Sequence, residues 1–499
     1  MTAPPLRSLA ERAFKWSAFT TAGRFVLQLV AQILLARLLG PDNYGVYGIG
    51  MVVLTFSTFL SGNAFSYVLM LRKDVDDHDV RFAFSWQLLA GTACALAMFA
   101  LAAPLAGFFS DARVEPMVHW MAVASLLLAL SGTAGCLLQR DLNFRALGLI
   151  QVAGYAAGYL LVGVPMALGG WGPQALAAAC VVQAAVVLVA SYAVRPHPLR
   201  LLLRHPLGAE TLHTGRTVFQ TNLTNWLLMN LDRIVMGRVL NPHAIGLYNV
   251  AYNIASIPHT LLVTALQPTL LATGARLQDD RGQLAQAWLM VLACIAVLLA
   301  PASVVMALLA GDLVQVLYGP AWSEAGWVMA VMFLCVPAWA ALNLSTPVLW
   351  NTGRKHLEVR LQLPLFLLAV PAWWLLAPHG VRAVALASAA VIALRAAVIV
   401  GASLRALQLP ATVLLPFAGR GLALALVCGG AVLLGRHGAA SLNHPIVTLL
   451  AGATLGMLVV LALVAARPQL LGPEARAVVA RLVPAIGPRW PTPAPEARP

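Results

Sequence analysis

The segment Ala36-Arg-Leu-Leu-Gly-Pro-Asp-Asn-Tyr-Gly-Val-Tyr47 returns later in the chain, without a gap, as Gly237-Arg-Val-Leu-Asn-Pro-His-Ala-Ile-Gly-Leu-Tyr248. Five of the twelve aligned positions are identical: Arg37/Arg238, Leu39/Leu240, Pro41/Pro242, Gly45/Gly246 and Tyr47/Tyr248. Proline cannot continue a helix and restricts the residue before it, and tyrosine favours the level of the lipid headgroups. Each copy is therefore predicted to be a tight turn between two membrane helices, and the chain is predicted to be a duplication.

The composition is that of a chain that lies mostly in lipid. Of the 499 residues, 60% are hydrophobic and 10% are charged, with a mean hydropathy of +0.82. Soluble proteins carry about 25% charged residues. The six cysteines all fall inside apolar runs without metal-ligand spacing, so we interpret them as small core residues. The sequence predicts no metal site and no cofactor.

Hydropathy predicts an all-α polytopic membrane protein with about fourteen spans, each near the ~20 residues that a bilayer requires. The predicted spans are 14–38, 44–70, 82–106, 117–138, 146–168, 174–194, 215–238, 244–271, 284–309, 324–350, 358–376, 382–404, 417–435 and 445–466.

Basic residues alternate between the two sets of connecting loops. Of the 32 Lys and Arg residues, 24 fall on one side, 5 on the other and 3 inside spans. Because cytoplasmic loops carry the excess of Lys and Arg, both termini are predicted to be cytoplasmic. This bias accounts for most of the net charge of +14, so no nucleic-acid partner is predicted.

Each copy of the repeat contains six predicted spans, so both copies are predicted to run in the same direction. A pseudo-two-fold axis along the membrane normal would then relate them, as in transporters built from parallel repeats. The predicted domains are a six-helix lobe at 1–194, a cytoplasmic linker at 195–214, a second six-helix lobe at 215–404, two additional helices at 405–466 and a Pro-rich cytoplasmic tail at 467–499.

Polar residues in the first span indicate a cavity. Arg24 lies ~15 Å along this span, near the membrane midplane. Thr21, Gln28 and Gln32 share a helical face with it. An intramembrane charge should face a cavity, although a long arginine side chain can also snorkel to the interface. The cavity is the interpretation that we favour for these four residues.

The equivalent positions of the seventh span are polar as well, which argues for an aqueous cavity shared by the two halves. The residues predicted to line it there are Asn222, Asn225, Asp232 and Arg233. Arg395, in the twelfth span, has two open interpretations, a cavity role or a structural role with a snorkelling side chain.

Signals of catalysis are missing from the sequence. It contains no Gly-Lys-Ser/Thr phosphate loop, no nucleophile elbow and no pair of intramembrane carboxylates. The predicted outer loops are too short for a catalytic domain. The protein is therefore predicted not to be an enzyme.

Four stretches carry a resemblance to a known family: Leu35-Ala-Arg-Leu-Leu-Gly-Pro-Asp-Asn-Tyr-Gly45, Leu137-Leu-Gln-Arg-Asp-Leu-Asn-Phe-Arg145, Asn230-Leu-Asp-Arg-Ile-Val-Met-Gly-Arg238 and Gly246-Leu-Tyr-Asn-Val-Ala-Tyr252 with Pro258. The chain resembles the Wzx-type polysaccharide and lipid-linked oligosaccharide flippases, in the superfamily that also holds MATE drug exporters and the lipid II flippase. The similarity covers most of residues 10–405. Its motifs are largely structural and do not identify the sugar.

The resemblance implies two six-helix lobes around a cavity that opens alternately to each side of the bacterial inner membrane. It implies translocation of polyprenyl-diphosphate-linked oligosaccharides, the precursors of exopolysaccharide or lipopolysaccharide. The lipid bilayer, a polysaccharide polymerase and export machinery are the other partners that it suggests. By analogy with the lipid II flippase, the two extra helices would form a groove for the polyprenyl tail. A midplane arginine flanked by amides and hydroxyls suits such an anionic, hydroxyl-rich substrate.

Two related transporters are the alternatives, a lipid II-type flippase and a MATE-like drug exporter. Cationic drugs and cation coupling favour an acid in the first span, where this chain has Arg24. A lipid II-type flippase also combines fourteen spans with a cationic cavity, but the motifs favour the polysaccharide branch. A membrane glycosyltransferase, polymerase or ligase would need a large outer loop or an acidic catalytic motif. A non-transporting scaffold would leave the polar faces unexplained.

Overall fold

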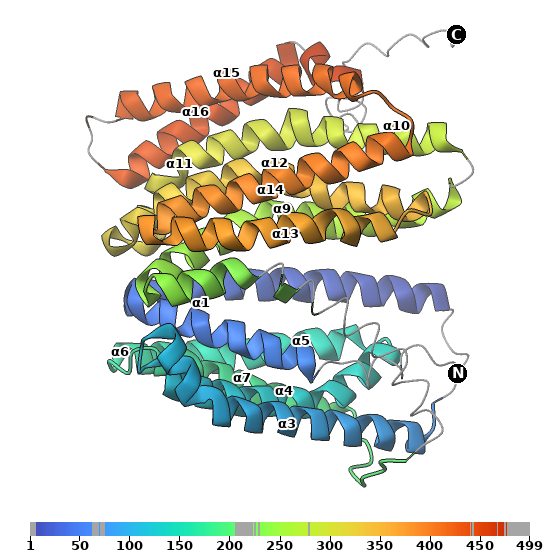
Figure 1. The fold of residues 1–499 in the computed structure, drawn as a ribbon, viewed down its shortest axis with the longest axis vertical. Helices are drawn as coiled ribbons and strands as arrows, with labels where there is room; N and C mark the ends of the chain where they lie inside the picture. Colours follow the sequence, from blue (N-terminus) through green and yellow to red (C-terminus); the bar gives the residue numbers. More distant parts are fainter. Residues whose placement is uncertain are drawn as a thin grey trace. The chain divides into compact units, whose positions relative to one another are not determined.

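The computed structural model is helical wherever regular structure occurs in its described part, which contains no β-strand (Figure 1). The described residues are 6–61, 69, 75–204, 223, 226–227, 230–277, 280–439, 441, 444–466, 468–473 and 476. The predicted all-α class is therefore confirmed. The chain divides into two compact units, Met1–Gly246 and Leu247–Pro499, which we describe separately. The finer predicted boundaries at 194, 214, 404 and 466 stay predictions.

The first unit is built from long apolar helices with short connections. They are α1 (Leu6–Leu60), α3 (Asp77–Phe109), α4 (Val114–Arg140), α5 (Phe144–Tyr155), the π-helix η1 (Ala156–Gly163), α6 (Val164–Leu168) and α7 (Gln174–Val194). Residues 230–239 are helical as well. Within this unit α3 packs on α4, α4 packs on α7, and α1 packs on α5 and α4.

A break inside α1 separates its two halves. Gly40 has φ 73° and ψ 172°, a backbone conformation that glycine adopts without steric cost, and Pro41 follows directly. Helical geometry resumes after Pro41, which suits the first positions of a helix because it lacks an N–H. The boundary between the first two predicted spans therefore falls at the predicted Gly-Pro step.

Small residues allow the helices of the first unit to approach closely. A Cβ at Gly158 of η1 would collide with the carbonyl oxygen of Ala179 in α7. The hydroxyl groups of Ser57 in α1 and Ser125 in α4 are hydrogen-bonded at 2.6 Å. Helices in lipid associate through such close packing and interhelical hydrogen bonds, because lipid gives no hydrophobic driving force between them.

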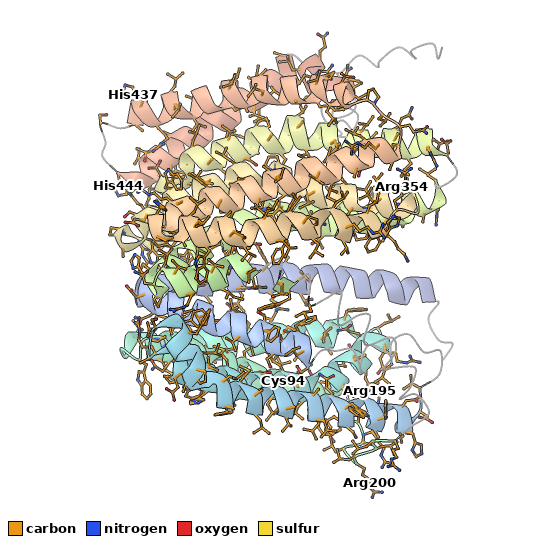
Figure 2. All side chains as sticks on the ribbon, in the orientation of Figure 1. Cys94, Arg195, Arg200, Arg354, His437 and His444 are labelled. Atoms are coloured by element: carbon orange, nitrogen blue, oxygen red, sulfur yellow. The ribbon has the colours of Figure 1, made fainter. Side chains whose placement is uncertain are left out.

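After α7 the chain continues as an extended segment, residues 195–204, which is bound to α3. The backbone N–H of Leu202 donates to Ser85 Oγ at 2.8 Å, and Arg81 Nε donates to the carbonyl oxygen of Arg200 at 3.0 Å. Arg195 and Arg200 lie at the same end of the first unit (Figure 2). This part of the predicted linker is thus held in place by α3.

His197 anchors that segment. Its ring lies 5.0 Å from Phe84 and 5.3 Å from Tyr192, measured between ring centroids. The partner of Nδ1, at 3.3 Å, is the carbonyl oxygen of Pro198, which can only accept, so Nδ1 carries the proton. Burial lowers the pKa of His197 below its usual value, and this hydrogen bond offsets only part of that effect. The segment is therefore docked with a neutral imidazole.

The second unit contains the remaining helices. They are α9 (Pro242–Arg276, which begins in the first unit), α10 (Arg281–Cys294), the π-helix η2 (Ile295–Leu299), α11 (Ala300–Tyr318), η3 (Pro320–Trp322), α12 (Ser323–Asn351), α13 (His356–Leu376), η4 (Ala377–His379), α14 (Val381–Ala406), η5 (Ala411–Leu414), α15 (Leu415–Ala439), α16 (Pro445–Ala466) and η7 (Pro468–Leu471). Within the unit α12 packs on α11 and α14, and α13 packs on α14.

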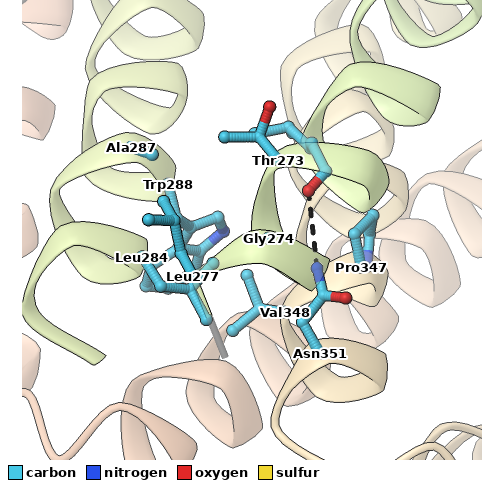
Figure 3. A pocket seen from close by; sticks show the side chains of 10 residues that line it. Thr273, Gly274, Leu277, Leu284, Ala287, Trp288, Pro347, Val348 and Asn351 are labelled. Atoms are coloured by element: carbon cyan, nitrogen blue, oxygen red, sulfur yellow. Dashed lines mark hydrogen bonds between the residues drawn. The ribbon is translucent and has the colours of Figure 1, made fainter. Parts of the chain in front are cut away.

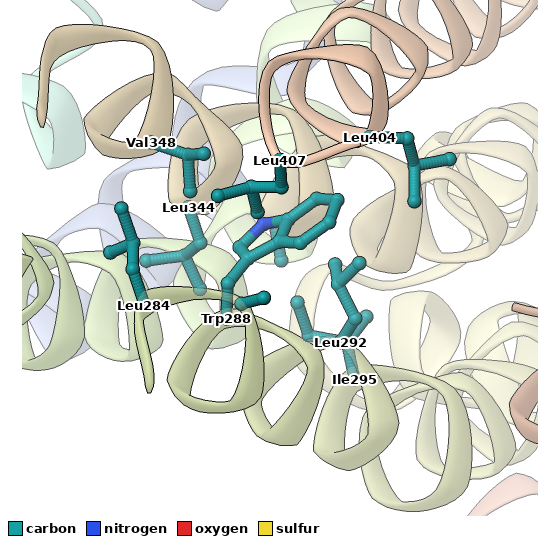
Figure 4. Packing of buried hydrophobic residues seen from close by; sticks show 10 residues of the cluster. Leu284, Trp288, Leu292, Ile295, Leu344, Val348, Leu404 and Leu407 are labelled. Atoms are coloured by element: carbon teal, nitrogen blue, oxygen red, sulfur yellow. The ribbon is translucent and has the colours of Figure 1, made fainter. Parts of the chain in front are cut away.

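Trp288 of α10 occupies a hydrophobic cluster of this unit (Figure 4). Its side chain is fully buried beside Leu292, Leu344 and Leu404. The indole Nε1 donates to Ser345 Oγ at 3.1 Å, so the one polar atom of the ring is satisfied. Truncating such a tryptophan to alanine typically lowers the free energy of unfolding by about 3–5 kcal/mol. We therefore expect this cluster to stabilise the fold.

The two last helices, α15 and α16, pack on each other and on α11. Arg436 of α15 forms a 2.9 Å ion pair with Asp312 of α11 and donates to the carbonyl oxygen of Leu308 at 2.8 Å. Gly435 faces the backbone of Ala451 in α16 so closely that a Cβ would collide with its carbonyl oxygen. These helices are therefore joined to the second unit by specific contacts, while the predicted groove for a lipid tail stays a prediction.

Twelve helices in the described residues are long and apolar enough to cross a membrane. Eleven of them correspond to one predicted span each, and Thr20–Leu60 combines the first two. The predicted seventh span, 215–238, lies mostly outside the described residues. The protein is thus a multi-pass membrane protein, and the count of about fourteen spans stays a prediction.

Candidate functional site

The predicted cavity residues of α1 are all accessible to some degree. Arg24 and Gln32 are half-buried, and Thr21 and Gln28 are exposed. Thr20, on the same side of the helix, is instead buried against α5. The structure therefore divides the polar face into a part that packs against a neighbouring helix and a part that a ligand can reach. The assignment of the reachable part to a cavity stays a prediction.

Arg24 lies beside phenol groups of the first unit. It is close enough to Tyr155 of α5 for the two groups to interact electrostatically. Gln32, two turns further along α1, hydrogen-bonds the side chain of Tyr44, which follows the break in that helix. Tyr155 is thus an aromatic and polar neighbour of Arg24 that carries no negative charge, since a phenol is neutral at pH 7.

Two further tyrosines extend this group. The hydroxyl groups of Tyr47 and Tyr159 are hydrogen-bonded at 2.8 Å, and the rings of Tyr155 and Tyr159 stack with centroids 4.3 Å apart. Tyr159 belongs to η1, and π-helical turns inside α-helices occur frequently at functional sites. Our sequence analysis missed these partners, although the spacing of Tyr155 and Tyr159 places them on one helical face.

The predicted residues of the seventh span are described only in part. Asn222 and Asn225 lie outside the described residues. Asp232 and Arg233 are half-buried, and Arg233 Nη1 donates to Asn230 Oδ1 at 3.4 Å. Whether these four positions line a cavity stays a prediction.

The described part of the predicted seventh span packs on the second half of α1 through Trp226. Trp226 Nε1 donates to Thr55 Oγ1 at 3.2 Å, and its ring lies 4.7 Å from that of Phe56. Aromatic contact and a satisfied indole N–H make this a specific packing contact. Helix–helix contact therefore fixes this segment within the first unit.

Arg395 of α14 has an uncharged partner. Its Nε donates to Gln362 Oε1 of α13 at 3.1 Å, and Nη2 donates to the same oxygen. Gln362 is 7% exposed, and no ion pair of Arg395 occurs among the described residues. The guanidinium is therefore held directly by an amide within the helix bundle, while the carboxylate of Glu358 interacts with it electrostatically without forming an ion pair. Such an arrangement suits an anion as the additional partner.

The two copies of the repeated turn contact each other reciprocally. A Cβ at Gly45 would collide with the carbonyl oxygen of Pro242, and a Cβ at Gly246 would collide with that of Pro41. Only glycine allows this approach of the two backbones. The predicted turn residues Pro41, Gly45, Pro242 and Gly246 thus have a packing role as well.

The same contact brings together two equivalent residues. His243 Nδ1 lies 3.1 Å from Asp42 Oδ2, and these two positions align with each other in the repeat. The turn residues Tyr47 and Tyr248 are 9% and 1% exposed, so their rings contact the protein interior rather than lipid headgroups. The turns therefore form a packed contact instead of two independent loops.

A small pocket between α9, α10 and α12 is a weaker candidate (Figure 3). Its lining is apolar except for Thr273 and Asn351. The Asn351 amide nitrogen already lies 3.4 Å from the carbonyl oxygens of Leu270 and Leu271. Because no charged side chain is found among the described residues that line this pocket, they offer no ion-pair partner to an anionic substrate.

The fold is shared with known membrane transporters. The lipid II flippase MurJ, in its inward closed conformation, superposes with a TM-score of 0.68 at 11% identity, over 89% of this chain and 97% of that chain. A multidrug resistance MATE family transporter of the MOP superfamily, in the inward-facing conformation, gives 0.62 at 13% identity, over 77% and 94%. At these identities the likeness shows the fold alone.

The sequence comparison identifies the family. The profile of the polysaccharide biosynthesis protein family matches residues 34–326, more than half of the chain, so the chain belongs to this family. The succinoglycan biosynthesis transport protein ExoT of Rhizobium meliloti is 26% identical over 74% of this chain and 71% of its own. The lipopolysaccharide biosynthesis protein WzxC of Escherichia coli is 23% identical over 66% and 67%. The resemblance to polysaccharide flippases is thereby confirmed.

Proposed function

We propose that this protein moves a polyprenyl-diphosphate-linked oligosaccharide, a precursor of exopolysaccharide or lipopolysaccharide, from the inner to the outer leaflet of the bacterial inner membrane. The observation that carries the proposal is the family match over residues 34–326. The transport and lipopolysaccharide roles in the names of two relatives point the same way. Translocation by alternating access requires no bond to be made or broken, so no catalytic group is needed.

The intramembrane arginines supply the chemistry that such a substrate requires. A diphosphate carries negative charge into lipid, where an isolated charge is expensive. Arg24, beside neutral phenols, and Arg395, beside a neutral amide, can both offer a positive charge to it. Guanidinium groups bind phosphate oxygens bidentately, through charge-assisted hydrogen bonds that are about twice as strong as neutral ones.

The same arginines argue against the alternative function, a MATE-like drug exporter. A cationic drug would be repelled by Arg24 and Arg395. A lipid II-type flippase is the closer alternative, since lipid II also carries a diphosphate and MurJ shares the fold. The family match favours polysaccharide precursors. In this proposal both termini are cytoplasmic, and a polymerase and the export machinery receive the product.

The test is polysaccharide export in a strain that lacks the gene. Arg24→Ala should abolish export, and Arg24→Lys should restore only part of it, because an ammonium keeps the charge but loses the planar pair of donors. Arg37→Ala, at an exposed position of the same helix, serves as the control and should export normally. Membrane abundance of each variant is measured in parallel. Normal export by abundant Arg24→Ala protein would remove Arg24 from the mechanism.

A further inference from the structure

An aromatic cluster lies in the second unit, on α9 and α12. The rings of His259 and Trp339 are stacked, with centroids 4.2 Å apart and planes at 12°. The ring of Tyr252 is 5.1 Å from that of Trp339, at 54°. Trp339 and Tyr252 are only half-buried, in contrast to Trp288 and Trp322, which are fully buried. This cluster is therefore accessible where the structural tryptophans are not.

Within the described residues, His259 and Asn343 each keep one side-chain atom without a hydrogen-bond partner. Asn343 Nδ2 donates to the carbonyl oxygen of Trp339 at 3.0 Å and to His259 Nε2 at 3.1 Å. Since Nε2 accepts, the neutral imidazole carries its proton on Nδ1. His259 is 8% exposed, and its Nδ1 has no hydrogen-bond partner among the described residues. No described bond uses Asn343 Oδ1 either.

An unpaired buried N–H is costly to leave without an acceptor. A buried donor without a partner costs about 1–3 kcal/mol, and such groups deserve an explanation by a missing water, ion or ligand. Here the open donor and the open acceptor belong to side chains that are joined to each other. The open donor can bind the oxygen of one ligand hydroxyl group, and the open acceptor can bind the hydrogen of another.

Arg395 adjoins this cluster. Trp339 and Leu361 pack around the same buried residues, which include Ala396. Leu361 and Ala396 are the direct neighbours of Gln362 and Arg395 in sequence. Tyr252 is also within electrostatic range of Arg395. A positive charge, half-buried aromatic rings and two open hydrogen-bonding atoms are thus contributed by α9, α12, α13 and α14 of one unit.

We propose that these residues form a subsite for the sugar that is bonded directly to the diphosphate, with Arg395 on the phosphate and Trp339, His259 and Asn343 on the sugar. This inference rests on the proposed function. A hexose offers an apolar C–H face to an aromatic ring and hydroxyl groups to the open donor and acceptor. Its anomeric phosphate is joined to the sugar ring through a single bridging oxygen atom. In this proposal the phosphate lies against Arg395, and the sugar next to it lies against the neighbouring aromatic cluster.

Binding of two lipids to the purified full-length protein in nanodiscs tests this subsite. The probes are undecaprenyl diphosphate and undecaprenyl diphosphate that carries a single hexose. Asn343→Leu and Trp339→Ala should each weaken binding of the hexose-bearing lipid about tenfold and leave binding of undecaprenyl diphosphate unchanged. Arg395→Gln should weaken binding of both lipids. Trp339→Phe keeps an aromatic face and should retain most of the affinity for the hexose-bearing lipid.

Trp327→Ala serves as the matched control, because it removes a half-exposed tryptophan from the same helix. It should bind both lipids as the unaltered protein does. If Trp339→Ala and Asn343→Leu, with normal melting temperatures, lose both lipids equally or neither, the subsite is refuted while the proposed function stands. If the unaltered protein binds neither lipid, the proposed function fails, and the subsite fails with it.

Discussion

Gln362 influences how strongly Arg395 can attract an anionic ligand. Its amide oxygen accepts two hydrogen bonds from the guanidinium and fixes its position, but it provides no negative charge. A carboxylate in this place would form an ion pair inside the bundle and compensate the charge. In a medium of low dielectric constant, a guanidinium that has no ion-pair partner in direct contact attracts a phosphate more strongly than it would in water.

Gln362→Glu is therefore expected to weaken binding of the diphosphate without lowering the stability of the protein. The substitution is nearly isosteric, so the melting temperature should stay the same or rise, while affinity for undecaprenyl diphosphate should fall about tenfold, because the new carboxylate competes for Arg395. Gln283→Glu, near the start of α10, is the control and should change neither quantity. A more stable protein with unaltered affinity would show that Arg395 has only a structural role.

The sequence predicted the intramembrane arginines but not their partners. Depth in a hydrophobic span is a local property, so Arg24 and Arg395 could be recognised from the sequence alone. Their partners Tyr155 and Gln362 lie on other helices. Contacts between helices far apart in the sequence depend on tertiary packing, which no local spacing encodes. The open atoms of His259 and Asn343 could only be recognised from the hydrogen bonds in the structure.

At the scale of elements, the repeated turns are packing elements. Their glycines allow backbone contact, Gly45 with Pro242 and Gly246 with Pro41. This explains why glycine is identical in the two copies, whereas the positions beside it vary more freely. Two of the five identical positions, the proline and the glycine, thus lie where the two turns meet.

Gly45→Ala should destabilise the protein through this contact. The new methyl group would overlap the carbonyl oxygen of Pro242, and backbone atoms cannot move aside as a flexible side chain can. Overpacking of this kind typically costs about 1–3 kcal/mol, which should appear as a lower melting temperature of the purified protein. Gly135→Ala, in α4, meets no atom within 4 Å and should be neutral or slightly stabilising. Equal melting temperatures of the two variants would contradict this packing role.

Helix positions were largely predictable because the bilayer fixes both the length and the apolarity of a span. The eleven single spans follow the hydropathy pattern closely. The π-helical turns η1 and η2 were not predicted, since they arise where packing inserts an extra residue into a helical turn. The attachment of α15 to α11 through Arg436 and Asp312 was not predicted either, because the two residues are far apart in sequence.

At the scale of the whole molecule, the two-fold relation between the two copies of the repeat is a prediction, and the contacts between the two turns lie within the first unit. Asp42 touches His243, its own equivalent, and the glycine contacts are exchanged between the two copies. Equivalent residues that meet each other, and reciprocal pairs around them, are the pattern that a two-fold relation produces. A two-fold axis along the membrane normal requires both copies to cross the membrane in the same direction.

Reporter fusions at Arg200 and Asn241 test that direction. The two sites flank the predicted seventh span, 215–238, so the fusion at Arg200 should report a cytoplasmic position and the fusion at Asn241 a periplasmic one. A fusion at Ser110, which precedes the tested span, is the control and should read periplasmic; a fusion at Gly353, which follows it, should read cytoplasmic only if residues 215–238 cross. If Arg200 and Asn241 both read cytoplasmic, residues 215–238 do not cross. The second copy would then run opposite to the first, the turn at Pro242 could not be equivalent to the turn at Pro41, and the charge bias of the later loops would be reversed. The parallel duplication would be refuted by that single result.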